Sequence, residues 1–364
     1  MKKTKVSGLF RLIAFLLIAT VLLCVFGFSA GGWQSMTNPD INSDNTVIDS
    51  GNVDENTAPS DDDLTPEVKY YDRLTGLEVT EEESHVKKTA FVINSSSPAY
   101  GLSTGELVIE FPTENGETRL LMYTKAINTL GKIGSIAPTR GFISDMIASF
   151  EAILIANGCD DTVDYSSFDT SGKLFDLSVN AGYSYTEYTH FVYSNHDLIK
   201  AGLANNSFAV TGGASGTLPY TVSSGCEYKN DGTTSAVSVV LGFSDTKTTE
   251  LYYSPDDGRY YLYENGSKRY DALYGKDISY KNAFVLFADT VTYESESGSE
   301  MIINTKNGGS GYYISCGVAK ELLWENVNGS LRFKDINGEV LTVAAGESYI
   351  GFLKSSSKSS LTVA

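Results

Sequence analysis

The chain has 364 residues, which leaves room for about two domains of roughly 150 residues each. Hydrophobic residues make up 41% of the chain and aromatic residues 12%, so the composition excludes a wholly disordered protein. The formal net charge of −18 argues against nucleic acid as a partner, because phosphate binding needs a basic surface.

Residues 1–30 are predicted to form a signal peptide or a membrane anchor. Nineteen residues without a charge, Leu12–Ala30, follow a flank that contains three lysines and Arg11. A helix of that length nearly spans a hydrocarbon core of ~30 Å, whereas a cleaved signal peptide usually has a shorter apolar region of roughly 7–15 residues. Because the basic flank stays in the cytoplasm, we expect the rest of the chain to lie outside, at the cell membrane.

Cys24 is a candidate lipid-attachment residue within this apolar segment, although the bulky Leu22 and Leu23 precede it. Three further cysteines lie outside the segment: Cys159, Cys226 and Cys316. They can form at most one intramolecular disulfide, so no disulfide framework holds the fold together. The chain has no C-x-x-C pair and only three histidines, so we expect no zinc site, no other metal and no cofactor.

Residues 31–68 contain nine acidic residues and neither Lys nor Arg, and their apolar residues follow no period. This composition predicts a disordered, self-repelling tether between the N-terminal segment and the folded part.

Residues 69–230 are predicted to form a layered α/β domain. Short runs of β-forming residues predict strands at 88–94, 106–111, 119–123 and 152–156. Phe142, Met146 and Phe150 lie four residues apart, which is typical of one helical face. A second helix is predicted to begin at Ser194, in a capping box where Asp replaces the usual Glu.

Residues 235–353 are predicted to form a mainly antiparallel β domain, which makes the fold class α+β. Asn-Gly or Asp-Gly pairs, which supply the positive φ angles of type I′ turns, recur at 257–258, 265–266, 307–308, 328–329 and 337–338. Short strands are predicted between them, at 238–243, 259–263, 283–287 and 330–334. One short helix is predicted at 318–324, and a flexible tail at 354–364.

The loop at 132–146 (KIGSIAPTRGFISDM) leads into the first predicted helix. Pro138 suits the first position of a helix, where its missing N–H is not needed. The free N–H groups and the positive end of the helix dipole could then bind an anion beside Arg140. The alternative is an ordinary helix start whose Arg140 pairs with an internal carboxylate such as Glu110 or Glu151.

Glu110 and Arg119 form a second candidate pair. Glu110 lies among apolar residues in one predicted strand, and Arg119 begins the next strand after a turn. We expect cross-strand pairing to bring the two together, either as a structural ion pair or as part of a binding site.

His190 lies between aromatic residues, ahead of the second predicted helix. It is either a structural histidine or a catalytic one. No G-x-S-x-G motif supports a serine hydrolase triad around it.

Five stretches occur in a characteristic order: 72–77 (DRLTGL), 89–94 (TAFVIN), 101–110 (GLSTGELVIE), 117–119 (ETR) and 132–134 (KIG). In this order the chain resembles the YerB-like envelope lipoproteins of Gram-positive bacteria, a family whose domains have no known function. The resemblance covers about 72–352. It implies an extracytoplasmic, membrane-attached protein with a layered α/β N-terminal domain, and it implies no established reaction.

The family pattern carries like residues at five positions of this chain: Glu110, Arg119, Arg140, His190 and Tyr193. Two departures stand out. Ala137 occupies a position where family members tend to have an additional Arg, and Asn157-Gly158-Cys159 replaces a His-Gly-Gly pattern. If those polar residues form a catalytic site in the family, that site is incomplete here. A family member should also have a clearer lipid-attachment cysteine than Cys24.

These observations favour a non-catalytic envelope protein that binds an anionic wall or lipid-headgroup ligand. Arg119 and Arg140 would bind the negative charge, while His190 and Tyr193 would shape the pocket. A rival hypothesis is a hydrolase of an envelope polymer, with Glu110 as acid/base and His190 assisting. A third is a scaffold for another envelope protein, which predicts an exposed apolar patch on the β domain. The sequence identifies neither the ligand nor a protein partner.

Overall fold

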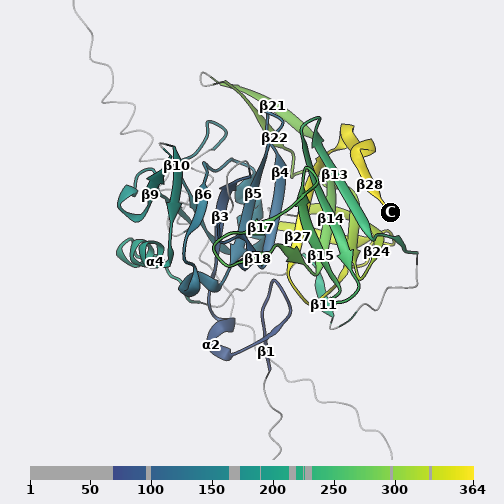
Figure 1. Ribbon diagram of the computed structural model, residues 1–364, viewed down its shortest axis with the longest axis horizontal. Helices are drawn as coiled ribbons and strands as arrows, with labels where there is room; N and C mark the ends of the chain where they lie inside the picture. The colour runs from purple at the N-terminus through teal and green to yellow at the C-terminus, as the bar shows by residue number, and fades with distance from the viewer. Residues whose placement is uncertain are drawn as a thin grey trace, which may run out of the picture. The chain divides into compact units, whose positions relative to one another are not determined.

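The computed structural model describes residues 69–95, 100–163, 173–188, 190–212, 219–223, 225, 232–295, 298–327 and 330–364 (Figure 1). All of these residues belong to one compact unit, Pro66–Ala364. The predicted N-terminal segment with Cys24 and the predicted tether both lie outside the described residues. Within the described ranges, no helix is long and apolar enough to cross a membrane.

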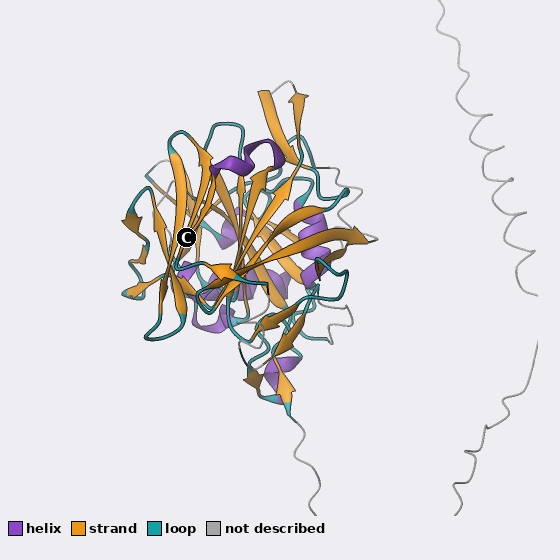
Figure 2. Cartoon of the chain, turned by 90° about the vertical axis from the view of Figure 1, so that its right-hand side faces the viewer, coloured by secondary structure: helices purple, strands orange, loops and turns teal. Residues whose placement is uncertain are grey.

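Strand is the main secondary structure (Figure 2), and the largest sheet has 14 strands. From one edge to the other, its main path is β12 (Thr234–Ser235), β24 (Val318–Val327), β23 (Gly309–Ser315), β20 (Asn282–Ala288), β27 (Ser348–Lys354), β4 (Leu107–Pro112), β5 (Thr118–Thr124), β3 (Lys88–Asn94), β6 (Ile133–Ile136), β10 (Phe191–Ser194) and β9 (Tyr185–Glu187). Three strands branch from this path: β25 (Ser330–Asp335) on β24, β7 (Ala152–Ala156) on β3, and β8 (Leu174–Asp176) on β7.

The centre of this sheet joins the two halves of the sequence. Strand β4 pairs in parallel with β27, so that Leu107 lies opposite Ser348 and Glu110 opposite Gly351. Strand β27 in turn pairs in parallel with β20. Strands from both sides of the predicted boundary at 230–235 therefore share one sheet.

A second, six-stranded sheet packs on one face of the first. Its strands are β16 (Ser267–Lys268), β15 (Arg259–Glu264), β14 (Lys247–Ser254), β13 (Ser238–Ser244) and β28 (Leu361–Val363) in order, with β19 (Ser279–Tyr280) on β15. Buried Leu241 and Leu251 from this sheet share a core with Val285 and Tyr349 of the large sheet. A Cβ on Gly351 would lie 2.3 Å from Leu241 Cδ2, so the sheets approach closely where β27 lacks a side chain.

Four two-stranded ribbons complete the strands. They are β1 (Tyr70–Tyr71) with β2 (Glu78–Val79), β11 (Thr221–Ser223) with β26 (Thr342–Ala344), β17 (Tyr270–Asp271) with β18 (Lys276–Asp277), and β21 (Thr290–Ser295) with β22 (Gly298–Ile303). The β21–β22 ribbon extends away from the sheets in both views (Figures 1 and 2).

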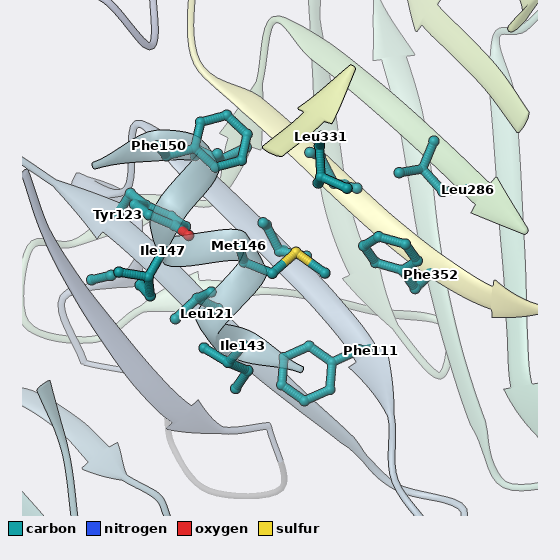
Figure 3. Packing of buried hydrophobic residues seen from close by; sticks show 14 of the residues in the cluster. Phe111, Leu121, Tyr123, Ile143, Met146, Ile147, Phe150, Leu286, Leu331 and Phe352 are labelled. Atoms are coloured by element: carbon teal, nitrogen blue, oxygen red, sulfur yellow. The ribbon is translucent and has the colours of Figure 1, made fainter. Parts of the chain in front are cut away.

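Helices are few and short in the described part of the chain. They are α2 (Glu81–Ser84), α3 (Ile143–Phe150), α4 (His196–Asn205) and the 3-10 turns η1 (Leu102–Thr104), η2 (Ala126–Thr129), η3 (Ala181–Tyr183) and η4 (Ser355–Ser360). Helix α3 forms where the apolar period predicts it. It covers the face of the large sheet opposite the six-stranded sheet, where Met146 and Phe150 pack with Phe111, Leu331 and Phe352 (Figure 3).

Most predicted elements are confirmed within one or two residues, but the fold is mostly β. The layered α/β arrangement expected for 69–230 is present only in part, because α3 and α4 are its only helices of eight or more residues within the described ranges. The predicted helix at 318–324 is wrong: this segment is β24, which has β23 on one side and β12 and β25 on the other.

Two further boundaries need correction. Ser194 ends β10 and does not cap α4; Asn195 is the cap, and its Oδ1 accepts the N–H of Leu198 at 3.0 Å. The C-terminal residues, predicted to be frayed, form η4 and then β28, which pairs with β13. Backbone pairing with an existing sheet orders this polar tail where composition alone predicts fraying.

The predicted turns behave differently from one another. Asn265 and Gly266 both have positive φ angles, 49° and 74°, and join β15 to β16 in the expected tight hairpin. At 257–258 only the glycine has a positive φ, within a longer loop between β14 and β15. The pair at 307–308 joins β22 to β23, which do not pair with each other, and 328–329 lies outside the described residues.

Candidate functional site

Arg140 is almost fully buried, with 3% of its side chain exposed. Its Nη1 and Nη2 form a bidentate pair with Glu114, at 2.8 and 2.9 Å, and its Nε lies 3.2 Å from Oδ2 of Asp160. Nη1 also donates to the carbonyl of Met301 at 3.0 Å. The guanidinium is therefore surrounded by acceptors of the protein itself.

Arg119 lies beside this pair and donates through Nη1 to the carbonyl of Pro138 at 3.0 Å. Burial and the positive charge of Arg140 lower the pKa of Arg119 to about 10, while Asp160, Glu114 and Glu300 act in the opposite direction. The cluster thus brings two guanidinium groups together with three carboxyl groups. Such a charge balance does not favour an additional anion.

The loop that leads into α3 is also satisfied internally. The N–H of Gly141 donates to Thr162 Oγ1 at 3.0 Å, and no side chain caps the helix at Phe142. This arrangement corresponds to the alternative in which Arg140 pairs with an internal carboxylate. Its partners are not the predicted ones: Glu110 lies elsewhere, and Glu151 pairs with Arg73 at 2.9 Å.

Glu110 does not pair with Arg119, and the predicted cross-strand pair is wrong. The register of β4 and β5 places Glu110 opposite Leu120 and Phe111 opposite Arg119. Because successive side chains point to opposite faces of a sheet, this one-residue offset puts Glu110 and Arg119 on different faces.

The buried carboxylate of Glu110 faces the six-stranded sheet. Its Oε1 accepts the hydroxyl of Thr118 at 2.5 Å, and its Oε2 accepts those of Thr249 at 2.9 Å and Tyr349 at 2.7 Å. Burial and the adjacent Glu110 raise the pKa of Tyr349 well above its usual range. These bonds connect β4, β5, β14 and β27, so Glu110 holds the two sheets together.

Tyr193 lies in a different cluster, near the other end of the large sheet. It is buried on β10, with its ring in an edge contact with Tyr100 at 5.8 Å. Lys132 Nζ lies 4.0 Å from the Tyr193 ring centroid and pairs with Glu187 at 2.6 Å. His190 is exposed in the turn between β9 and β10, where its ring contacts Phe191.

The five candidate residues therefore occupy separate places. Arg119 and Arg140 lie together, and Glu110 is on the opposite sheet face. Tyr193 on β10 and His190 in the β9–β10 turn are separated from β5 by β3 and β6. The single pocket expected to contain both arginines, His190 and Tyr193 is not formed by the described residues.

The two departures from the family pattern lie in contact with each other. The N–H of Asn157 donates to the carbonyl of Ala137 at 3.0 Å, and Thr139 pairs with Cys159 in a parallel bridge directly beside Arg140. Any polar group that stood at these positions would border the arginine cluster. In this chain, Ala137 joins the core beneath α3.

Asp72, the first residue of the stretch 72–77, belongs to a separate buried ion cluster with Lys88 and Glu106. Asp72 Oδ1 accepts the N–H groups of Leu74 and Thr75, while Oδ2 pairs with Lys88, which also pairs with Glu106 at 2.7 Å. Burial opposes ionisation of Asp72, but Lys88 and the N–H of Thr75 hold its pKa below the usual value. Burial raises the pKa of Glu106. Asp72 thereby closes the loop between β1 and β2 and ties it to Lys88 of β3.

A groove of about 810 Å³, which sequence reasoning missed, lies between the edge of the six-stranded sheet and β23–β24. Its apolar lining includes Phe287, Leu323, Ile336, Leu361 and Val363, and polar residues such as Ser310, Glu321, Asn337 and Lys358 also line it. The signal was present in the run 322–324, three consecutive apolar residues. In a strand, successive side chains point to opposite faces, so Leu323 must lie on the face opposite Leu322 and Trp324. The prediction of a helix for this segment hid that consequence.

The described ranges contain no candidate metal site, and they describe two of the three cysteines outside the N-terminal segment. No group of three or more His, Cys, Asp or Glu side chains there could hold a metal ion. Cys316 is disulfide-bonded, Cys159 carries a thiol, and Cys226 lies outside the described residues.

Comparisons with known proteins identify the family. Two family models match the chain: "Protein of unknown function (DUF3048) N-terminal domain" over residues 74–209 and "Protein of unknown function (DUF3048) C-terminal domain" over residues 239–350. The chain therefore belongs to the DUF3048 family. No curated protein matches it.

Among solved structures, the chain is similar to the crystal structure of the YerB protein from Bacillus subtilis, with a TM-score of 0.69 and 20% identity. The match covers 81% of this chain and 100% of that chain. It confirms the YerB-like fold, and at this identity it shows the fold alone.

Proposed function

We propose that this chain is a non-catalytic protein, attached to the membrane through residues 1–30, which binds another envelope protein outside the cell. The observation that supports this proposal best is the apolar groove, in which Leu323 is 44% exposed and Ile336 is 61% exposed. Large apolar side chains exposed in a concave surface are one mark of a site that binds a partner.

The distribution of exposed apolar side chains also supports a scaffold. Ten of the fifteen large hydrophobic residues exposed among the described residues belong to 235–353, namely Val237, Tyr252, Tyr270, Leu273, Val291, Tyr293, Leu323, Val327, Ile336 and Val340. The scaffold hypothesis expects this location.

The anionic-ligand hypothesis receives less support from the geometry. Arg140 already binds Glu114 and Asp160, and Arg119 lies within the same cluster. The ligand-binding roles of Arg119, Arg140, His190 and Tyr193 stay predictions.

The hydrolase hypothesis lacks a reacting pair. A general acid/base must reach the proton that it transfers, usually with a second group nearby. The carboxylate of Glu110 is buried and accepts hydrogen bonds from three hydroxyl groups. His190 lies on the exposed turn between β9 and β10, the last two strands at one edge of the large sheet.

Site-specific photo-crosslinking in cells tests the proposed function. A photo-reactive amino acid would replace Leu323 in the full chain, and Val179, which is 79% exposed, would be replaced as a matched control. We expect a discrete protein adduct at position 323 and none at 179. Absence of an adduct at 323, or equal adducts at both positions, would contradict the proposal.

A further inference from the structure

Strand β28 is an edge strand whose outer backbone groups are available. It pairs with β13 on one side, and no strand of the described residues pairs with its other side. Ala364 exchanges both backbone hydrogen bonds with Ser238. In an antiparallel ladder hydrogen-bonded pairs alternate with pairs whose groups point away, so the N–H and C=O of Val363 face the open side. The C=O of Leu361 faces the same side.

The large sheet continues beneath this open edge. One cross-strand row on its inner face runs from Val285 through Tyr312 to Glu321, and in the next row Ser310 pairs with Leu323. The six-stranded sheet ends at β28 before it covers the outer parts of these rows. The groove therefore lies beside β28, at the place where the next strand of the six-stranded sheet would pair.

One lysine of the groove selects among extended segments. Lys358 is exposed, donates to Ser310 Oγ at 3.0 Å and lies over the Phe287 ring. Lys320 pairs with Tyr313 across the strands, so its side chain is on the face of β24 opposite Leu323 and Glu321, where it interacts with the carboxylate of Asp335. Lys358 is therefore the positive group that a carboxylate of a bound segment can reach.

We propose that the groove takes an extended segment of a partner protein as an added strand beside β28. The segment would place apolar side chains at alternate positions against the floor and carry a carboxylate toward Lys358. Backbone hydrogen bonds to an edge strand and side-chain pockets at every second residue are the usual basis of such recognition. The inference rests on the proposed function and specifies the chemistry of the partner.

The test is a peptide selection on the full chain in detergent micelles. A displayed library of random decapeptides serves as the probe, and the most enriched peptide is then synthesised. We expect enrichment of alternating apolar residues with Asp or Glu. In an extended peptide, alternate backbone N–H groups point to opposite sides, and only one side would face β28. Methylation of the nitrogens on that side should weaken binding at least tenfold. Methylation of the nitrogens on the other side should leave the affinity unchanged. Failure to enrich such a pattern, or equal sensitivity of both edges, would overturn the inference.

Two variants of the protein provide independent readouts. Val363→Pro removes an outward N–H and leaves the bonds of Ala364 and Thr362 to β13 in place; we expect at least tenfold weaker binding. Lys358→Glu alters an exposed side chain, keeps the backbone intact, and should weaken binding of the acidic peptide by about tenfold. Unchanged affinity in Lys358→Glu would contradict the charge selection, and unchanged affinity in folded Val363→Pro would contradict strand addition.

The outcomes separate this inference from the proposed function. An adduct at position 323 that persists in the Val363→Pro chain would retain the protein-binding function and refute strand addition. Concentration-dependent dimers that disappear in Val363→Pro would show that β28 pairs with a second copy of this chain, which also refutes the partner segment. Loss of the 323 adduct in Val363→Pro, together with the peptide results, would support both.

Discussion

At the scale of single residues, Arg140 shows how a residue that looks suited to a ligand can serve the fold. Its positive charge is balanced by Glu114 and Asp160, and through the carbonyl of Met301 it connects the start of α3 to β22. Removing it would leave two partly buried carboxylates without their counter-charge. Breaking a buried pair in this way is costly, because the remaining charge has neither partner nor water.

We therefore expect Arg140→Met to lower the free energy of unfolding by about 3–5 kcal/mol, as measured by urea denaturation. Arg73→Met is the matched control: Arg73 pairs with Glu151, and about a third of each side chain is exposed to water (30% each). Exposed pairs contribute only ~0–1 kcal/mol, so the control should unfold almost like the unmodified chain. Similar losses in both variants would show that the Arg140 cluster is not the buried structural pair described here.

Glu110 shows why the candidate site was only partly predictable. Both strands of its hairpin were predicted within a residue or two, but their register was not. Pairing of Pro112 with Thr118 leaves five residues in the connection, and a connection one residue shorter or longer would move Glu110 to the other face. The sequence pattern indicates a turn near Asn115-Gly116, yet it does not specify the number of residues that the turn encloses.

At the scale of elements, helix α4 depends on a glycine in its interior. A Cβ on Gly202 would lie 2.4 Å from Phe175 Cζ and 2.9 Å from Tyr183 Cγ. Helix propensity alone favours alanine over glycine by ~1 kcal/mol. The packing contribution to stability favours glycine here, because the aromatic rings beneath the helix occupy the space that the methyl group of alanine needs.

Gly202→Ala is therefore expected to destabilise the protein by about 1–3 kcal/mol despite its better helix propensity, since overpacking a well-filled core costs about that much. Thermal unfolding with Gly182→Ala as control measures the effect. A Cβ at Gly182 meets nothing within 4 Å, so its melting temperature should change little. Stabilisation by Gly202→Ala would mean that α4 can move away from Phe175 at low cost.

Strand β24 illustrates the limit of local patterns at this scale. The segment 318–324 (VAKELLW) is rich in residues that favour helices, and its apolar residues fit a helical period as well as a strand. Its neighbours decide the outcome, because β23 and β25 offer partners for the backbone along most of its length. By contrast, α3 and β7 were predicted correctly, since burial and local propensity agree there.

At the scale of the whole molecule, the parallel pairing of β4 with β27 is the feature that the sequence hides most completely. Residues 107–110 pair with 348–351, and no local motif records a partner so far along the chain. The change of composition near 230–235 and the two family models suggest separable halves. The structure instead gives them a shared sheet and a shared core, in which α3 packs on Leu331 of β25 and Phe352 of β27 (Figure 3).

This sharing predicts that residues 69–230 do not fold alone. Without β27, the edge of β4 would expose unpaired backbone groups beside Leu107 and Ile109, and α3 would lose part of its apolar partner surface. The isolated fragment should lack a cooperative urea transition, whereas 66–364 should unfold in a single one, and co-expression with 232–364 should restore it. A fragment that unfolds cooperatively on its own would show that β4 does not need β27, and that the N-terminal half is an autonomous domain joined to the second by an ordinary interface.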